Sequence, residues 1–137
     1  MDLNDLASLD TADFTATHPK TLKKVRGSDD KAWVWTIAGP AHPLTLAMKS
    51  EARQRAADAS KASDGEISQE LMRKLAIQNA ARRVLGWTTQ SSGGVDFPCT
   101  FDNVCDIFSD MKYDWLYRQA LTFMADDASF MSGSASV

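Results

Sequence analysis

The chain has 137 residues, of which 44% are hydrophobic and 24% charged, a composition that fits one folded domain and argues against a disordered chain. Its formal net charge is −3, with 15 basic against 18 acidic residues, so nonspecific binding to nucleic acid, which needs a concentrated basic surface, is not expected. No stretch approaches the roughly 20 apolar residues of a membrane span, and the acidic start MDLNDLASLD lacks the pattern of a secretory signal, which predicts a cytosolic protein without a membrane partner.

The first predicted elements are a short helix and a β-hairpin. Leucines recur at every third position within residues 2–14 and indicate a helix there. The hairpin is predicted at about residues 20–37, with strands at 21–26 and 32–37. Its turn is the Gly-Ser-Asp sequence at 27–29, whose residue types favour a reversal of the chain.

The second strand of this predicted hairpin carries two tryptophans. Trp33, Trp35 and Ile37 alternate along it and therefore share one face. Two interpretations stay open for that face. It packs onto the helices as part of the core, as aromatic faces usually do, or it is offered to a neighbouring subunit.

Two long helices are predicted in the middle of the chain. The first begins at about Pro43, a favoured first-turn residue, and ends at about Ala62. Its second half, EARQRAADASKAS, is rich in alanine and polar residues, so it has little to bury and is expected to project into solvent or to acquire a partner. After a break at residues 63–65, the second helix is predicted at 68–85, with Gly86 as its left-handed C-terminal cap.

The C-terminal third predicts a loop followed by two helices. The loop covers residues 90–96 and contains a Gly-Gly turn. A short helix is predicted at 101–109 with Thr100 as its N-cap, and a final helix at 113–130. The tail SGSASV, residues 132–137, is short and polar and is predicted to be disordered.

Together these elements predict a mainly α fold: a single small helical domain over residues 1–131 with an N-terminal β-hairpin. Trp87 follows the predicted cap and is expected to bury its ring beneath the 101–109 helix. Self-association is expected through the tryptophan-bearing strand, the 43–62 helix or both, because a chain of this size buries only about two-thirds of its surface.

No catalytic residue, cofactor or metal site is predicted. The sequence contains no supporting motif for a Ser/His/Asp or Cys/His constellation, no phosphate loop and no dinucleotide fingerprint. Cys99 and Cys105 are expected to be reduced thiols, and His18 and His42 lie too far away in sequence to complete an evident zinc site with them. An enzyme that uses Cys99 with a distant histidine stays an alternative.

Several segments, taken in order, resemble the tail assembly chaperones of long-tailed (siphovirus) bacteriophages. The matching pattern is the basic AARRVLGW, a polar loop, and VDFPCTFDNVCDIFSD leading to YDWLYRQALTFMADDASFM. The stretch VWTIAGPAHPLTLAMKSEARQR is similar to the strand, Gly-Pro turn and long polar helix of that family. The resemblance covers about residues 20–131, and its motifs are short and mostly structural.

This resemblance implies a protein that acts in the host cytoplasm during tail assembly and is absent from the mature virion. The implied partners are the tape measure protein, the tail tube protein, a frameshift-extended form of the chain itself and further copies of the chain. The resemblance carries no binding residue over to this sequence.

The residues themselves suggest where a partner binds. We expect contacts at Trp33 and Trp35, and at Phe130 and Met131 near the C-terminus, made through apolar surface rather than charge. Two other functions stay open: a structural virion protein, such as a head–tail connector or minor tail protein, and a small regulator that binds DNA through its two long helices. The net negative charge argues against the regulator.

Overall fold

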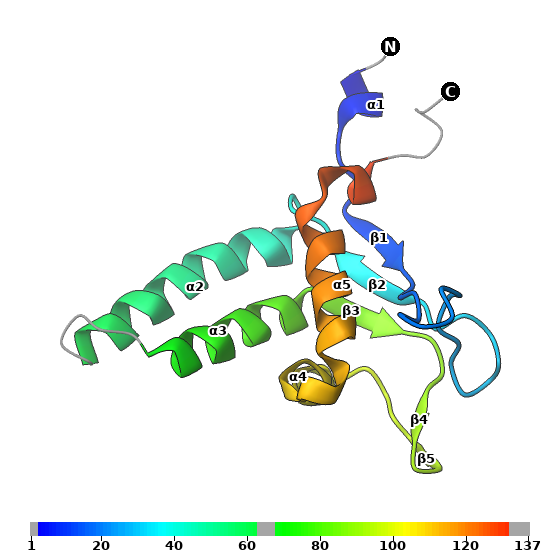
Figure 1. The fold of residues 1–137 in the computed structure, drawn as a ribbon. Helices are drawn as coiled ribbons and strands as arrows, with labels where there is room; N and C mark the ends of the chain where they lie inside the picture. Colours follow the sequence, from blue (N-terminus) through cyan, green and yellow to red (C-terminus); the bar gives the residue numbers. More distant parts are fainter. Residues whose placement is uncertain (1–2, 63–67, 132–137) are drawn as a thin grey trace.

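The computed structural model describes residues 3–62 and 68–131 (Figure 1). The predicted mainly α fold is wrong, because the chain forms a small α+β domain that is 51% helical and 17% strand. The predicted break at residues 63–65 and the predicted disordered tail at 132–137 lie outside the described residues. Among the described helices, none has the length and apolar character that crossing a bilayer requires.

Helices and strands are interspersed along the chain. The helices are α1 (Leu3–Leu6), α2 (Pro43–Ala62), α3 (Gln69–Arg82), α4 (Phe101–Ser109) and α5 (Asp114–Ala125). The 3-10 helices flanking α5 are Met111–Tyr113 and Asp127–Phe130. The strands are β1 (Thr11–Phe14), β2 (Trp35–Ala38), β3 (Val84–Trp87), β4 (Ser91–Ser92) and β5 (Val95–Asp96).

The main sheet is antiparallel in the order β1-β2-β3, so β2 is its central strand. This corrects the predicted hairpin: the turn at 27–31 exists, but residues 21–26 meet the next segment only through an isolated bridge between Arg26 and Ala32. β2 pairs instead with two strands from distant parts of the sequence. Their register places Phe14 and Trp87 opposite Trp35, so the aromatic rings reinforce the pairing.

β3 also replaces the predicted end of the second long helix. The helix starts where predicted, with Ser68 as its N-cap, but ends at Arg82, and the chain then enters the sheet. Gly86 is paired with Thr36 and does not adopt a left-handed conformation, so the predicted cap at Gly86 is wrong. Trp87 is half-buried and its ring stacks on that of Phe97.

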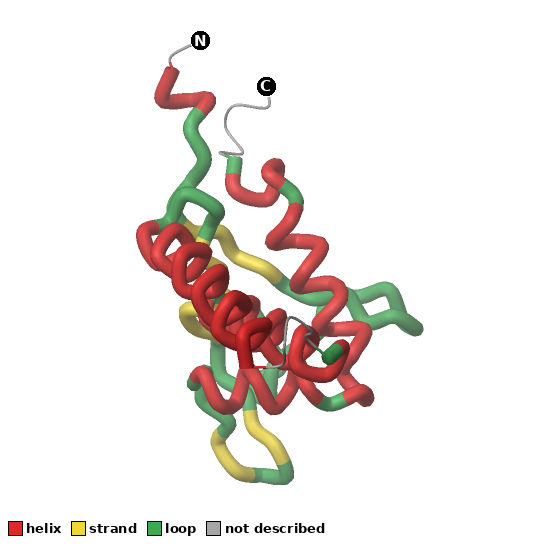
Figure 2. The backbone as a smooth tube through the Cα atoms, turned by 90° about the vertical axis from the view of Figure 1, so that its left-hand side faces the viewer, coloured by secondary structure: helices red, strands yellow, loops and turns green. Residues whose placement is uncertain are grey.

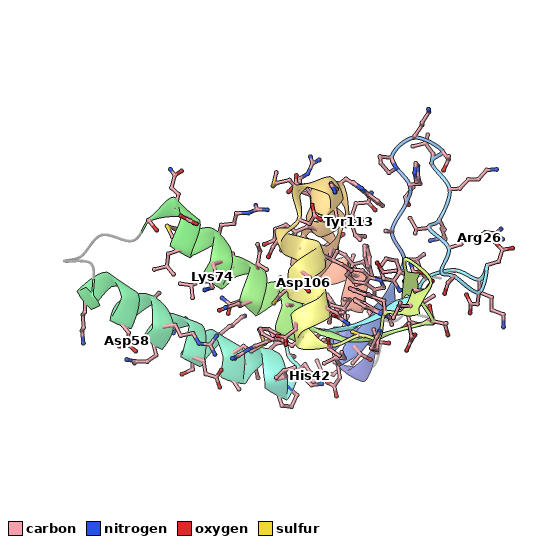
Figure 3. The ribbon with its side chains drawn as sticks, turned by 90° about the horizontal axis from the view of Figure 1, so that it is seen from below. Arg26, His42, Asp58, Lys74, Asp106 and Tyr113 are labelled. Carbon is pink, nitrogen blue, oxygen red and sulfur yellow. The ribbon has the colours of Figure 1, made fainter. Side chains whose placement is uncertain are left out.

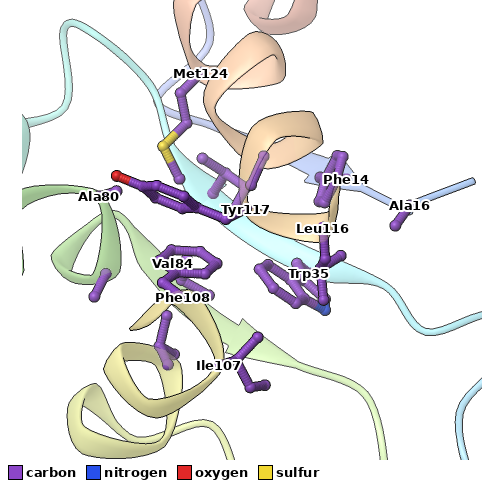
Figure 4. Close-up of a cluster of buried hydrophobic side chains, with 14 of the residues drawn as sticks. Phe14, Ala16, Trp35, Ala80, Val84, Ile107, Phe108, Leu116, Tyr117 and Met124 are labelled. Carbon is purple, nitrogen blue, oxygen red and sulfur yellow. The ribbon is translucent and has the colours of Figure 1, made fainter. Parts of the chain in front are cut away.

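The core lies where α4 and α5 cover the main sheet (Figure 4). Trp35 of β2, Phe108 of α4 and Tyr117 of α5 are all buried there. The ring centroids of Trp35 and Phe108 are 5.9 Å apart, and those of Phe108 and Tyr117 are 4.8 Å apart. This packing joins strands and helices into one core, which explains why the domain is not a helical bundle.

α2 and α3 form an antiparallel arm that projects away from the sheet (Figure 1), and Figure 2 views this arm from its tip. The bounds predicted for α2 are confirmed, and so is the expectation that its second half projects into solvent. Asp58 and Lys74 lie along the outer part of the arm (Figure 3). Near its base, the Glu51 carboxylate pairs with the guanidinium groups of Arg55 and Arg82, which ties α2 to α3.

Short-range sequence features predicted most of the remaining elements, namely the start of α4, the turn between β4 and β5 and the last helix. The Asn103 N–H donates to the Thr100 hydroxyl at 3.1 Å, which confirms the predicted N-cap of α4. Gly93 and Gly94 have φ angles of +59° and +81° and form the tight turn between β4 and β5. The predicted final helix is shorter than expected, because Asp126 is extended and starts a 3-10 helix.

Candidate binding groove

The four residues predicted to contact a partner do not form a surface. Trp33, Trp35 and Phe130 expose 6%, 1% and 0% of their area, and Met131 is half-buried. The interpretation of the tryptophan face as core is therefore confirmed. Phe130 lies in the core beside Phe123, with ring centroids 5.5 Å apart. A partner that binds this conformation needs another surface.

A groove of about 380 Å³ opens between the base of the arm and α5. Residues of α2, α3 and α5 line it together with the residue that follows α3: Thr45, Met48, Lys49, Ala76, Asn79, Ala80, Arg83, Leu121, Met124 and Ala125. Most of these side chains are apolar or small. The groove is therefore a concave apolar surface, the kind of surface on which protein and peptide partners bind.

The groove owes its shape to side-chain size. Met48 and Met124 are buried, while Leu121 is partly exposed at 37%. Ala76 and Ala80 are one helical turn apart on α3, and their small side chains leave the space between α3 and α5 open. Small residues at this spacing let another helix approach α3 closely.

Two polar groups at this groove lack partners within the described residues. The Thr45 hydroxyl is buried, with the residue 3% exposed, and no described group bonds to it. Arg83 donates through Nε to the carbonyl of Ala38 at 3.0 Å, but its Nη2 is buried without an acceptor. Burial lowers the pKa of Arg83. With Lys49 also lining it, the groove favours an occupant that carries an acceptor or an acidic group.

Cys99 and Cys105 lie outside this groove and are both half-buried free thiols. Burial raises the pKa of Cys99 to about 11, and burial, with the charges of Asp102 and Asp106, raises that of Cys105. A raised pKa keeps a cysteine as the unreactive thiol. No cluster of three or more His, Cys, Asp or Glu residues within 3–62 and 68–131 is placed to hold a metal ion.

We expect Cys99 in the folded protein to react with a thiol reagent at about pH 8 roughly 100-fold more slowly than an ordinary cysteine, because its thiolate fraction is lower by that factor. The rate is measured with an alkylating agent on Cys105→Ser, which leaves Cys99 as the one thiol. The same variant in urea serves as the control and should react at the rate of a free peptide. Equal rates in the folded and unfolded states would contradict the prediction.

Comparisons of the chain with protein-family models, with curated proteins and with solved structures each find no match.

Proposed function

We propose that this protein is a tail assembly chaperone of a long-tailed bacteriophage and that it binds the helical tape measure protein in the groove between α2, α3 and α5. The observation that carries the proposal is the groove itself: an apolar recess at the base of an arm, with a buried hydroxyl and a buried guanidinium nitrogen that lack partners within the described residues. The motif pattern of residues 20–131 supports the assignment to this class of protein.

The groove suits an amphipathic helix. An apolar side chain of such a helix enters between Met48 and Met124, while Leu121 covers its flank. Burying one side chain of leucine size contributes about 1.5–3 kcal/mol, so a few anchors suffice for specific binding. A carboxylate or carbonyl near the anchor meets Arg83 and Thr45, which gives the site a preference beyond apolarity.

We place the contact with the tape measure protein in the groove and not at Trp33 and Trp35, because these two side chains are buried. We also propose that the tail tube protein, a frameshift-extended form and further copies of the chain are partners during assembly. The protein acts in the host cytoplasm and is absent from the mature virion. An immunoblot of purified phage particles tests the last point, and a stoichiometric signal would favour a structural virion protein instead.

Ala76→Arg is expected to weaken binding of tape measure fragments at least tenfold, about 1.4 kcal/mol, because the long charged side chain fills the groove. Ala76 is exposed, so the fold should tolerate the change. Ala57→Arg is the matched control, since Ala57 is also exposed on the arm and does not line the groove. Both variants are compared with the original chain by calorimetry.

The salt dependence of the affinity distinguishes an apolar contact from an ionic one. Affinity should change little between about 0.1 M and 1 M salt, over which the screening length falls from about 10 Å to 3 Å. Unchanged binding by Ala76→Arg would place the contact outside the groove. No binding by the original chain at either salt would overturn the chaperone function itself.

A further inference from the structure

A second pocket, of about 390 Å³, shares no lining residue with the groove. It lies between α4, the start of α5, the β4–β5 hairpin and the loops that precede β2. Its lining residues include Trp33, Phe97, Asp106, Asp110, Tyr113 and Trp115. Aromatic rings and two carboxylates therefore share one pocket.

The two carboxylates come from adjacent turns at the C-terminal end of α4. Asp106 is exposed and forms no ion pair or hydrogen bond with the described residues through its side chain. Asp110 accepts a hydrogen bond from the Lys112 N–H at 3.0 Å through Oδ1, which leaves its other oxygen available. The C-terminus of α4 adds the negative end of a helix dipole. The pocket thus concentrates negative charge without a described cation to neutralise it.

The aromatic residues add to the attraction for a cation. Tyr113 and Trp115 line the pocket from the segment after α4, and Trp33 and Phe97 from the sheet side. Asp106 and Tyr113 are labelled in Figure 3 on these two neighbouring segments. The faces of aromatic rings attract cations, and the attraction grows when the site excludes water.

Trp33 supplies a separate indication of an occupant. It is 6% exposed and lines the pocket, and its indole N–H has no acceptor within the described residues. Its ring packs against Trp35 and Trp87 at 5.0 and 5.2 Å, and these rings offer carbon faces rather than a conventional acceptor. A buried N–H without an acceptor is unfavourable. The nitrogen is covered in this conformation, so a carbonyl oxygen of an occupant satisfies it once the indole ring turns toward the pocket.

We propose that this pocket binds a lysine side chain of a partner polypeptide, with the ammonium group between Asp106 and Asp110 and a main-chain carbonyl accepting from the Trp33 indole. Lysine fits better than arginine because an ammonium group has three rotatable donors that can reach two separate carboxylates. A guanidinium group works best against a single carboxylate that it binds with two parallel hydrogen bonds. The site does not depend on the function proposed for the groove.

The test uses the full chain and N-acetyl-lysine N-methylamide as the probe, followed by NMR of the indole N–H groups. Trp33→Phe identifies the Trp33 resonance by its loss. We expect the probe to shift this resonance, and its Nζ-acetylated form, which carries no charge, to leave it unchanged. Asp106→Asn should weaken binding about fivefold, whereas Asp102→Asn, on the same helix but outside the pocket lining, should not.

Three results would overturn parts of the proposal. Equal binding of the charged and acetylated probes would remove the role of the carboxylates. Tighter binding of the arginine analogue would show that the pocket prefers arginine to lysine. Equal binding of cadaverine, a diamine without a carbonyl group, would remove the role assigned to the Trp33 N–H and make the site one for small amines.

Discussion

Trp35→Ala is expected to lower the free energy of unfolding by about 3–5 kcal/mol, the largest single effect that we predict. Trp35 lies on the central strand and is 1% exposed. Its ring contacts those of Phe14, Trp33, Trp87 and Phe108, with centroid separations of 5.0 to 5.9 Å. Removing the ring leaves a cavity where strands and helices meet, and the rigid neighbours can close it only in part.

The loss is measured by urea denaturation followed by far-ultraviolet circular dichroism, because the substitution removes a fluorophore. The free energy of unfolding of a small domain is about 5–15 kcal/mol, so a loss of the expected size can leave Trp35→Ala largely unfolded in water. Trp35→Phe is the second variant, with an expected loss of about 1–2 kcal/mol. Met72→Ala is the surface control, since Met72 is 57% exposed, and should change stability by less than about 0.5 kcal/mol. A loss below about 1.5 kcal/mol for Trp35→Ala would contradict the role of this ring.

Gly39→Ala is expected to destabilise the fold by roughly 2–3 kcal/mol through overpacking. A Cβ atom at Gly39 would lie 2.6 Å from the carbonyl oxygen of Leu9, 3.1 Å from the Phe130 ring and 3.2 Å from the carbonyl oxygen of Asp10. The Gly39 N–H also donates to the Asp10 carbonyl at 2.7 Å. Two of the three obstacles are backbone atoms, so a methyl group must push the segment before β1 away from the end of β2.

Gly86→Ala is the matched control for this prediction. A Cβ atom at Gly86 meets no heavy atom within 4 Å, and its φ angle is not in the left-handed region. Its stability should stay within about 0.5 kcal/mol of the original chain, or rise slightly because alanine restricts the unfolded state. Thermal unfolding of both variants gives the comparison. Equal destabilisation at the two positions would mean that the close approach at Gly39 does not control the packing.

The elements that depend on neighbours along the chain could be predicted from the amino-acid sequence. The helix at 43–62, the cap at Thr100 and the Gly93–Gly94 turn were predictable because each rests on side chains or backbone preferences within a few residues. Alternation along the predicted strand showed that Trp33 and Trp35 share one face, but it left open whether that face is buried in the core or offered to a partner.

The sheet and the two sites, in contrast, could not be predicted from the sequence, because they depend on how the whole chain packs. β1 and β3 were predicted as parts of helices, because their short apolar patterns fit either structure and their pairing with β2 joins segments that are remote in sequence. The groove combines side chains from three helices, and the pocket at Trp33 combines the loops before β2, the β4–β5 hairpin, α4 and the start of α5. Pairing and packing between remote segments depend on which surfaces the whole chain brings together. Which remote segments meet is a property of the whole fold, and no local pattern of residues shows it.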